Sequence, residues 1–165
     1  MSDRKQKTEK TDNTFDFSTK KKVSIWVSQH PYKDIPDEYF EETFSRNNTR
    51  ATNLWSKNYR IKYFKPDDLE TNGAESGTID VKSAAAECSF SSSFMNPLMN
   101  RARKKKINDI TWMILIYEME YNSKLTGTES DEFTKFMGAF NYDDSADSLT
   151  DVADKPANDP FSFKK

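Results

Sequence analysis

The sequence predicts an α+β fold: a mainly antiparallel sheet with helices packed on one face, flanked by disordered N- and C-terminal tails. Three observations predict this class. Residues 107–121 form a long stretch rich in apolar and β-branched side chains, shorter stretches alternate with a two-residue period, and helix-like segments lie between them. A length of 165 residues predicts one domain, and the sequence contains no internal repeat.

Residues 107–121 are expected to be the central strand. Apolar side chains run almost continuously from Ile110 to Tyr117, and their β-branched and aromatic character favours a strand over a buried helix. A strand that is apolar on both faces has to be covered on both faces. After Tyr117, the alternation of Glu118 and Glu120 with apolar neighbours predicts that the strand leaves the core. The apolar run is much shorter than the about 20 residues of a membrane-spanning helix, so no membrane partner is expected.

Three other stretches alternate with the period of a half-buried strand. In residues 22–29, valine and isoleucine alternate with other side chains, and the outer face is expected to carry Trp26. In residues 58–65, Tyr59, Ile61 and Tyr63 alternate with Arg60, Lys62 and Phe64. Residues 132–142 alternate more loosely and are expected to form a last strand with a kink at Gly138.

Helices are expected in the intervening segments. Residues 36–45 begin with Pro36 and two acids, which suit the first turn of a helix and the positive end of its dipole. Residues 79–87 form an alanine-rich segment, and residues 93–105 end in a basic run that suits the negative end of the dipole. Residues 51–57 are expected to add one helical turn.

The chain ends differ from the middle in composition and charge. Residues 1–21 are expected to be a disordered basic tail, residues 22–143 the folded domain, and residues 144–165 a disordered acidic tail. Residues 1–22 hold seven Lys/Arg and four Asp/Glu, whereas residues 141–165 hold three and six. With a net charge of -2, the chain lacks the concentrated positive charge of a dedicated nucleic-acid binder, so no direct nucleic-acid partner is expected.

The residue inventory excludes several kinds of site. The single cysteine, Cys88, excludes an internal disulfide, and one cysteine with one histidine cannot form a standard structural zinc site. The four glycines form no phosphate-binding loop, so no cofactor is expected. No apolar stretch follows the charged start of the sequence, which predicts no signal peptide and a cytoplasmic location.

Three groups of side chains have the chemistry for catalysis, each with a plainer interpretation. His30 precedes a proline in an expected turn, where an exposed histidine is common. Cys88 lies near a possible helix start, but a buried, inert thiol is the plainer interpretation. The acids of residues 67–75 suit a carboxylate site, or a solvated patch that faces a partner. A small enzyme that uses His30 or this acidic loop is therefore one hypothesis.

Aromatic and acidic side chains in expected loops and on outer strand faces indicate a binding protein instead. Large aromatic residues surrounded by charges are common in protein interfaces. The residues expected to contact a partner are Trp26, Trp55, Tyr63, Phe64, Asp67, Asp68, Glu70 and Glu75.

Five segments together resemble one known family. They are K-V-S-I-W-V (residues 22–27), Y-F-K-P-D-D-L-E (63–70), C-S-F-S-S-S-F (88–94), N-D-I-T-W-M-I-L-I-Y-E-M-E-Y (108–121) and F-M-G-A-F-N-Y-D (136–143). In their order and character they resemble the immunity protein 22 family of bacterial polymorphic toxin systems. The resemblance covers roughly residues 22–143.

The resemblance implies a cytoplasmic, non-enzymatic α+β protein that protects its producer by binding a cognate toxin domain. If that toxin is a nuclease, its groove is basic, and the acids Asp67, Asp68, Glu70 and Glu75 would steer association and imitate phosphates. A different hypothesis is an adaptor or scaffold with a disordered basic arm. One dominant partner in a pull-down from cell extract would favour immunity, and many partners would favour a scaffold.

Overall fold

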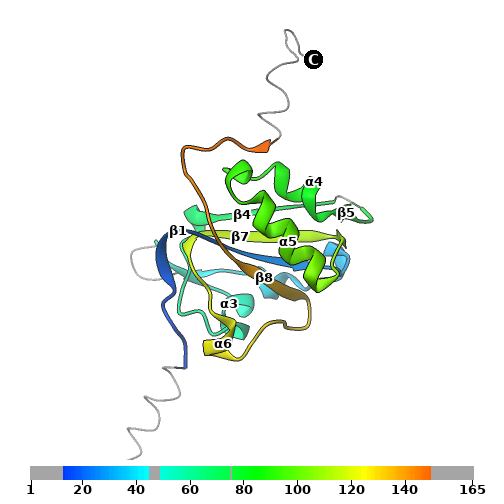
Figure 1. The fold of residues 1–165 in the computed structure, drawn as a ribbon. Helices are drawn as coiled ribbons and strands as arrows, with labels where there is room; N and C mark the ends of the chain where they lie inside the picture. The colour runs from blue at the N-terminus through cyan, green and yellow to red at the C-terminus, as the bar shows by residue number, and fades with distance from the viewer. Residues whose placement is uncertain (1–12, 45–48, 75, 150–165) are drawn as a thin grey trace, which may run out of the picture.

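The computed structural model describes residues 13–44, 49–74 and 76–149. At its centre is a four-stranded sheet in the order β4-β7-β1-β8, and each neighbouring pair of strands is antiparallel (Figure 1). The strands are β1 (Ser18–Ser28), β4 (Leu69–Gly73), β7 (Trp112–Met119) and β8 (Thr134–Asn141). The predicted α+β class and antiparallel sheet are confirmed.

Short elements surround the sheet. The helices are α2 (Asp37–Phe40), α3 (Leu54–Asn58), α4 (Val81–Ala86), α5 (Met95–Lys105) and α6 (Ser123–Thr126), with 3-10 turns η1 (Tyr32–Asp34), η2 (Pro66–Asp68) and η3 (Ser91–Ser93). Two-residue strands pair as β2 (Thr43–Phe44) with β3 (Ala51–Thr52), and as β5 (Ile79–Asp80) with β6 (Asp109–Ile110).

The inner strand β7 comes from the stretch predicted to be central. Its side chains are buried on both faces, because Met113 and Leu115 belong to one apolar cluster and Ile114 and Ile116 to another. The strand is shorter than the predicted residues 107–121, since Asp109 and Ile110 pair with β5 instead. Coverage on both faces, which the apolar run predicted, is confirmed.

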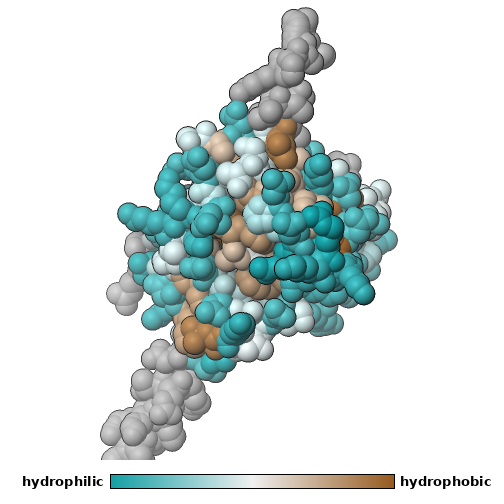
Figure 2. Space-filling view, in the orientation of Figure 1, coloured by the Kyte–Doolittle hydropathy of each residue, from teal (hydrophilic) through white to brown (hydrophobic). Residues whose placement is uncertain are grey.

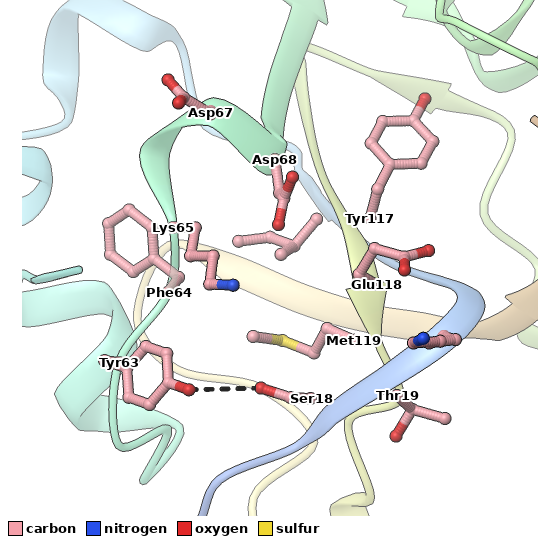
Figure 3. Close-up of a pocket in the computed structure, with 12 residues that line it drawn as sticks. Ser18, Thr19, Tyr63, Phe64, Lys65, Asp67, Asp68, Tyr117, Glu118 and Met119 are labelled. Carbon is pink, nitrogen blue, oxygen red and sulfur yellow. Dashed lines mark hydrogen bonds between the residues drawn. The ribbon is translucent and has the colours of Figure 1, made fainter. Parts of the chain in front are cut away.

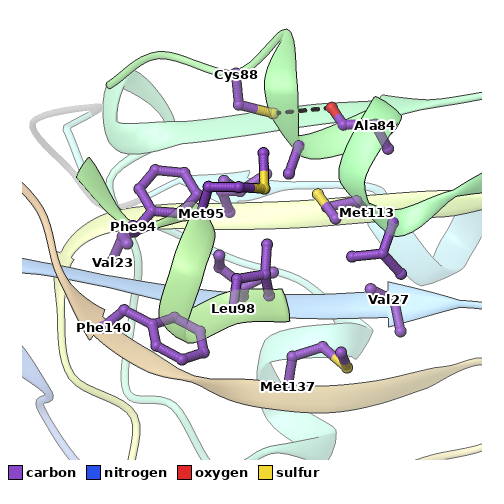
Figure 4. Packing of buried hydrophobic residues seen from close by; sticks show 14 of the residues in the cluster. Val23, Val27, Ala84, Cys88, Phe94, Met95, Leu98, Met113, Met137 and Phe140 are labelled. Carbon is purple, nitrogen blue, oxygen red and sulfur yellow. Dashed lines mark hydrogen bonds between the residues drawn. The ribbon is translucent and has the colours of Figure 1, made fainter. Parts of the chain in front are cut away.

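The two longest helices within the described residues, α4 and α5, cover one face of the sheet. Phe94 and Leu98 lie over the sheet in one buried cluster with Val23 and Val27 of β1, Met113 of β7 and Met137 of β8 (Figure 4). The outer side of α5 is exposed and basic, and Figure 2 shows a mainly hydrophilic surface over these helices. The predicted helices 79–87 and 93–105 are confirmed with slightly different ends.

Aromatic side chains fill the opposite face of the sheet, beneath α2, α3 and the segment that follows α3. Trp26, predicted on an outer strand face, is 0% exposed and lies edge-to-face with Trp55, with ring centroids 4.8 Å apart. Tyr59, Tyr121 and Phe136 also contact the Trp26 ring, at 5.7, 5.3 and 5.1 Å. The sheet therefore carries helices on both faces, the longer ones on one face and short ones on the other.

Two predicted elements on this aromatic face are wrong. The helix expected at residues 36–45 ends at Phe40, and the chain turns into β2, whose partner β3 lies beyond the undescribed residues 45–48. Residues 58–65 are not a continuous strand. Within this segment, Ile61 forms an isolated β-bridge with Phe15, and Phe64 forms another with Ala51.

The described fold extends past both predicted domain limits. At the N-terminal side, β1 begins at Ser18 rather than residue 22, and Phe17 is buried among the aromatic residues. At the C-terminal side, Leu149 packs against the helical face and its N–H donates to Ser91 Oγ at 2.8 Å. The remainder of both predicted tails, residues 1–12 and 150–165, lies outside the described residues.

Candidate functional site

An open depression lies where β1 and β7 separate, next to η2. Its volume is about 580 Å³. Figure 3 shows Asp68 and Lys65 pointing toward its centre from the η2 side, with Glu118 on β7 across from them. A second depression of about 480 Å³ shares Asp67, Asp68 and Tyr117 with the first. We call the two together the acidic hollow.

The hollow exists because the β1–β7 ladder is interrupted. The paired residues are Val23 with Tyr117 and then Ser18 with Met119, so β1 has more residues than β7 between these pairs. Lys21 and Glu118 both have positive φ, at 62° and 60°, in this interruption. A non-glycine residue with positive φ is uncommon and carries backbone strain, which persists only where the surrounding structure fixes it.

Glu118 is fixed by the irregular backbone around it. Its Oε2 accepts the Lys21 N–H at 2.9 Å and the Tyr142 hydroxyl, and the Lys21 carbonyl accepts the Tyr142 N–H at 3.1 Å. The hydrogen bond from Tyr142 lowers the pKa of Glu118, and burial raises the pKa of the Tyr142 hydroxyl. Glu118 therefore stays ionised and the phenol stays neutral at physiological pH.

The 3-10 turn η2 presents Asp67 and Asp68. Pro66 at its start fixes one backbone dihedral, and the backbone N–H of Asp68 closes the turn on the Lys65 carbonyl at 2.8 Å. Asp67 is exposed, whereas Asp68 is half-buried. Burial raises the pKa of Asp68, and the charges of Glu118 and Asp67 raise it further against the opposing effect of Lys65. Asp68 is therefore a carboxylate that a cation in the hollow would stabilise.

Carboxylates outnumber ammonium groups around the hollow. Together the two depressions are lined by Asp67, Asp68, Glu70, Glu118 and Asp144 against Lys20 and Lys65. Lys21 Nζ lies beside the rim and pairs with Asp144 Oδ1 at 2.9 Å, but both side chains are more than half exposed. Such an exposed pair contributes little to stability. The hollow therefore attracts positively charged groups.

Glu70 has a structural role that its sequence position did not indicate. It lies in β4 rather than in a loop, and its carboxylate accepts the Ser89 N–H at 3.1 Å and the Tyr117 hydroxyl at 2.9 Å. Burial and the negative charge of Glu70 raise the pKa of Tyr117, which stays a donor. Glu70 thus joins β4, β7 and the turn after α4, and its carboxylate is already engaged.

The structure separates the residues predicted to contact a partner. Tyr63, Asp67 and Asp68 line the hollow, and Arg50 lies 4.3 Å above the Tyr63 ring. By contrast, Trp26 and Trp55 are 0% exposed and Phe64 is 1% exposed, so these three are core residues and not surface residues. Glu75 lies outside the described residues.

The candidate catalytic side chains lie in separate surroundings. His30 is exposed, and its ring packs edge-on against Phe133 at 5.5 Å. Cys88 is buried beneath α4, its Sγ lies 3.6 Å from the Ala84 carbonyl oxygen, and burial raises the pKa of its thiol to about 12. That thiol is protonated at physiological pH, as expected for an inert core cysteine.

Among residues 13–44, 49–74 and 76–149, no three or more His, Cys, Asp or Glu side chains are grouped so as to hold a metal ion. In the same residues, no helix has both the length and the apolar character to cross a bilayer.

The sequence pattern does not identify Glu118, Tyr142 and Asp144 as residues of the site. The sequence pattern indicates Glu118 only as the point where the central strand leaves the core, and Asp144 falls in the predicted acidic tail. The available signal is the same alternation at Glu118 and Glu120, because a strand that leaves the core opens a space beside it. Which segment lines that space depends on tertiary structure, so a local pattern does not identify it.

Most of the chain matches the model of a known protein family. Residues 23–143 match the family model described as Immunity protein 22. No curated protein and no solved structure matches the chain.

Proposed function

Because the chain belongs to the Immunity protein 22 family, we propose that it neutralises a cognate toxin of a polymorphic toxin system by binding the toxin domain directly. Membership itself supports an immunity role. The proposed mechanism is occlusion: the protein covers the toxin's working surface and catalyses no reaction. It acts in the cytoplasm of the producing cell.

The acidic hollow is the observation that carries this proposal. Asp67, Asp68 and Glu118 line one open depression, and hydrogen bonds from the Lys21 N–H and the Tyr142 hydroxyl hold the Glu118 carboxylate in a fixed position. Fixed charges lose little entropy on binding, which favours tight association. A hollow of this charge is complementary to a protein surface rich in lysine or arginine.

The charge of the hollow points to a kind of toxin surface. A toxin that acts on nucleic acid has a basic cleft, and carboxylates placed in that cleft occupy the positions of phosphates. A stable interface buries about 800 Å² on each partner, which is more than the hollow alone supplies. The hollow is therefore proposed as one part of the contact, where it steers association.

The test is co-expression and binding with the toxin domain encoded beside this protein's gene. The double variant Asp67→Lys/Asp68→Lys is expected to slow association at low salt by about tenfold or more, because it replaces steering attraction with repulsion. Stopped-flow association rates and survival of toxin-expressing cells measure the effect. Glu70 is left unchanged, because its substitution would disturb the fold.

The control is Asp109→Lys/Glu132→Lys, which makes the same change of net charge at two other exposed positions. It is expected to keep both the association rate and the protection. Unchanged association for Asp67→Lys/Asp68→Lys would exclude the hollow from the interface. If the wild-type protein does not bind the toxin domain at all, direct binding is excluded.

A further inference from the structure

A cluster of three aromatic rings lies at the start of β7, at the opposite end of the strand from Glu118. Trp112 is the first residue of β7, Tyr32 lies in η1 and Phe40 ends α2. The ring centroids are 4.4 Å apart for Phe40 and Trp112, 5.7 Å for Tyr32 and Trp112, and 6.4 Å for Tyr32 and Phe40. We call these three rings the aromatic patch.

The patch reaches the surface but is braced from beneath. Tyr32 is 55% exposed, and Phe40 and Trp112 are half-buried. Phe40 packs edge-on against the buried Tyr39 at 4.7 Å, and Tyr39 packs against Phe133 at 5.2 Å. The rings are therefore held in position before any partner arrives, which reduces the entropy lost on binding.

Exposed carboxylates lie in the same segment as Tyr32 and Phe40, within η1 and α2 and directly after α2. Residues 32–42 carry five acids and one base, a net charge of -4, and these acids are all exposed: Asp34, Asp37, Glu38, Glu41 and Glu42. Aromatic faces attract cations through their quadrupole, and nearby carboxylates add to that attraction. The combination of open rings and a negative rim selects a positively charged side chain, arginine above all, because its planar guanidinium stacks on rings.

We propose that the aromatic patch and its acidic rim form a second docking surface, which binds a protein segment that carries arginine next to apolar residues. This inference rests on the proposed function, since the segment would belong to the toxin. Tyr32 and Trp112 supply the contact area, and Glu38 and Glu41 supply the charge. The apolar neighbours of the arginine cover the remaining ring edges.

A second copy of this chain is a poorer occupant of the patch. A symmetric dimer through the patch would bring the two acidic rims together, and like charges placed across an interface oppose association. A head-to-tail contact with the basic end of α5 would assemble many copies into a ring or an open chain of molecules. A partner with opposite charge satisfies both the rings and the rim.

The probe is a twelve-residue peptide of alternating arginine and leucine, and the readout is tryptophan fluorescence of the full-length protein. Of its three tryptophans, Trp26 and Trp55 are 0% exposed, so acrylamide quenching reports mainly on Trp112. The peptide is expected to protect Trp112 from quenching. A peptide of alternating glutamate and leucine is expected to give no protection.

Variants separate this surface from the hollow. Tyr32→Ala is expected to weaken peptide binding by about three- to thirtyfold, the range of a cation–π contact, whereas Tyr32→Phe keeps the ring and the affinity. Glu38→Gln/Glu41→Gln is expected to weaken binding and reduce its salt dependence. Asp109→Asn/Glu132→Gln, with the same charge change elsewhere, and the hollow variant Asp67→Lys/Asp68→Lys are expected to leave Trp112 protection unchanged.

Several outcomes would overturn this inference. They are equal protection by the glutamate peptide, equal weakening in the Asp109→Asn/Glu132→Gln control, and no protection of the wild-type protein. A concentration-dependent rise in mass in analytical ultracentrifugation that Tyr32→Ala abolishes would identify a second copy as the occupant. Since the peptide assay contains no toxin, failure of the proposed function leaves its result unaffected.

Discussion

The two faces of the sheet are built in different ways. The face beneath α4 and α5 is filled mainly by aliphatic side chains and methionines, among them Val23, Leu98 and Met113. The other face is filled by rings, with Trp26 and Trp55 at its centre, under short helices and irregular segments.

The difference shows that a sheet face covered by long helices and one covered by short segments need different hydrogen bonds. A long helix satisfies its own backbone, so the aliphatic face needs few polar contacts beneath it. On the aromatic face, side-chain hydroxyl groups tie the short segments together. The Tyr59 hydroxyl donates to the Thr134 carbonyl at 2.9 Å, and Asp131 accepts from the Tyr39 hydroxyl and from Asn58 Nδ2 at 3.0 Å.

The largest effect is expected from truncation of the aromatic face. Trp55→Ala is expected to lower the free energy of unfolding by about 3–5 kcal/mol, because it leaves a cavity among rings that cannot collapse to fill it. Urea denaturation measures the change. Leu54→Ala, the adjacent position in α3 with a 48% exposed side chain, is the control and is expected to change stability by less than about 0.5 kcal/mol. Similar effects at both positions would contradict the burial of Trp55.

Truncation of the aliphatic face is expected to cost less. Leu98→Ala removes a fully buried side chain of α5 and is expected to cost about 3 kcal/mol, since the methionines nearby can shift into part of the space. The exposed Asn96→Ala in the same helix is the control. If Leu98→Ala cost more than Trp55→Ala by denaturation, the aliphatic face would be the more tightly packed one.

The third-largest loss of stability is expected when the hydrogen bonds to Asp131 on the aromatic face are removed. Asp131→Ala removes the acceptor of Tyr39, Asn58 and the Thr134 N–H, the last at 2.8 Å, and is expected to cost about 2 kcal/mol. Hydrogen exchange is expected to rise in α2 and α3 and to stay unchanged in α5. The exposed neighbour Glu132→Ala serves as the control. Faster exchange in α5 as well would show that the two faces unfold together.

The smallest expected changes in stability come from two substitutions in the acidic hollow, and these changes have opposite signs. The raised pKa of Asp68 means that its ionisation costs stability as the pH rises through that pKa, so Asp68→Asn is expected to be the more stable form at pH 7. The lowered pKa of Glu118 adds stability above the ordinary pKa of 4.5, which is lost as the pH falls through the folded value, so Glu118→Gln is expected to be less stable at pH 7.

Both differences are expected to stay below about 1 kcal/mol, because water screens partly exposed groups, and to vanish in strong acid. Thermal unfolding at pH 7 and at low pH measures them. Shifts of the same sign for the two variants would contradict the assigned environments.

The aliphatic face could be predicted from the sequence, and the aromatic face could not. Helices 79–87 and 93–105 and strand 132–142 are predictable because their patterns are local. The prediction for Trp26 is wrong because its strand neighbours Ser24 and Ser28 look like surface residues. Both serines are buried, and Ser24 Oγ donates to the Met119 carbonyl at 2.8 Å and accepts the Tyr121 N–H at 2.9 Å. A buried serine of this kind forms its hydrogen bonds with residues far away in the chain, so its neighbours in the sequence do not reveal its burial.

The candidate site could be predicted only in part, because some of its residues give a local signal in the sequence and others are placed by distant contacts. Tyr63, Asp67 and Asp68 are identifiable because the Pro-Asp-Asp turn is a local signal of an exposed loop. Residues 58–65 do not form the predicted strand because an alternating pattern needs a continuous neighbouring strand, and this segment meets only isolated partners. Glu118 lines the hollow because the pairing of β1 with β7 is irregular at this point. No residue type in the sequence predicts that irregularity.

Strand β7 sets the distance between the two proposed docking surfaces. Trp112 begins it and Glu118 lies six residues later, a span of about 20 Å in an extended chain. A contact area of about 800 Å² is roughly 30 Å across, so a single continuous footprint reaches from one end of the strand to the other. A hydrogen-bonded strand hardly stretches, so the distance between Trp112 and Glu118 is fixed. A matching protein would therefore need positive groups at the same spacing.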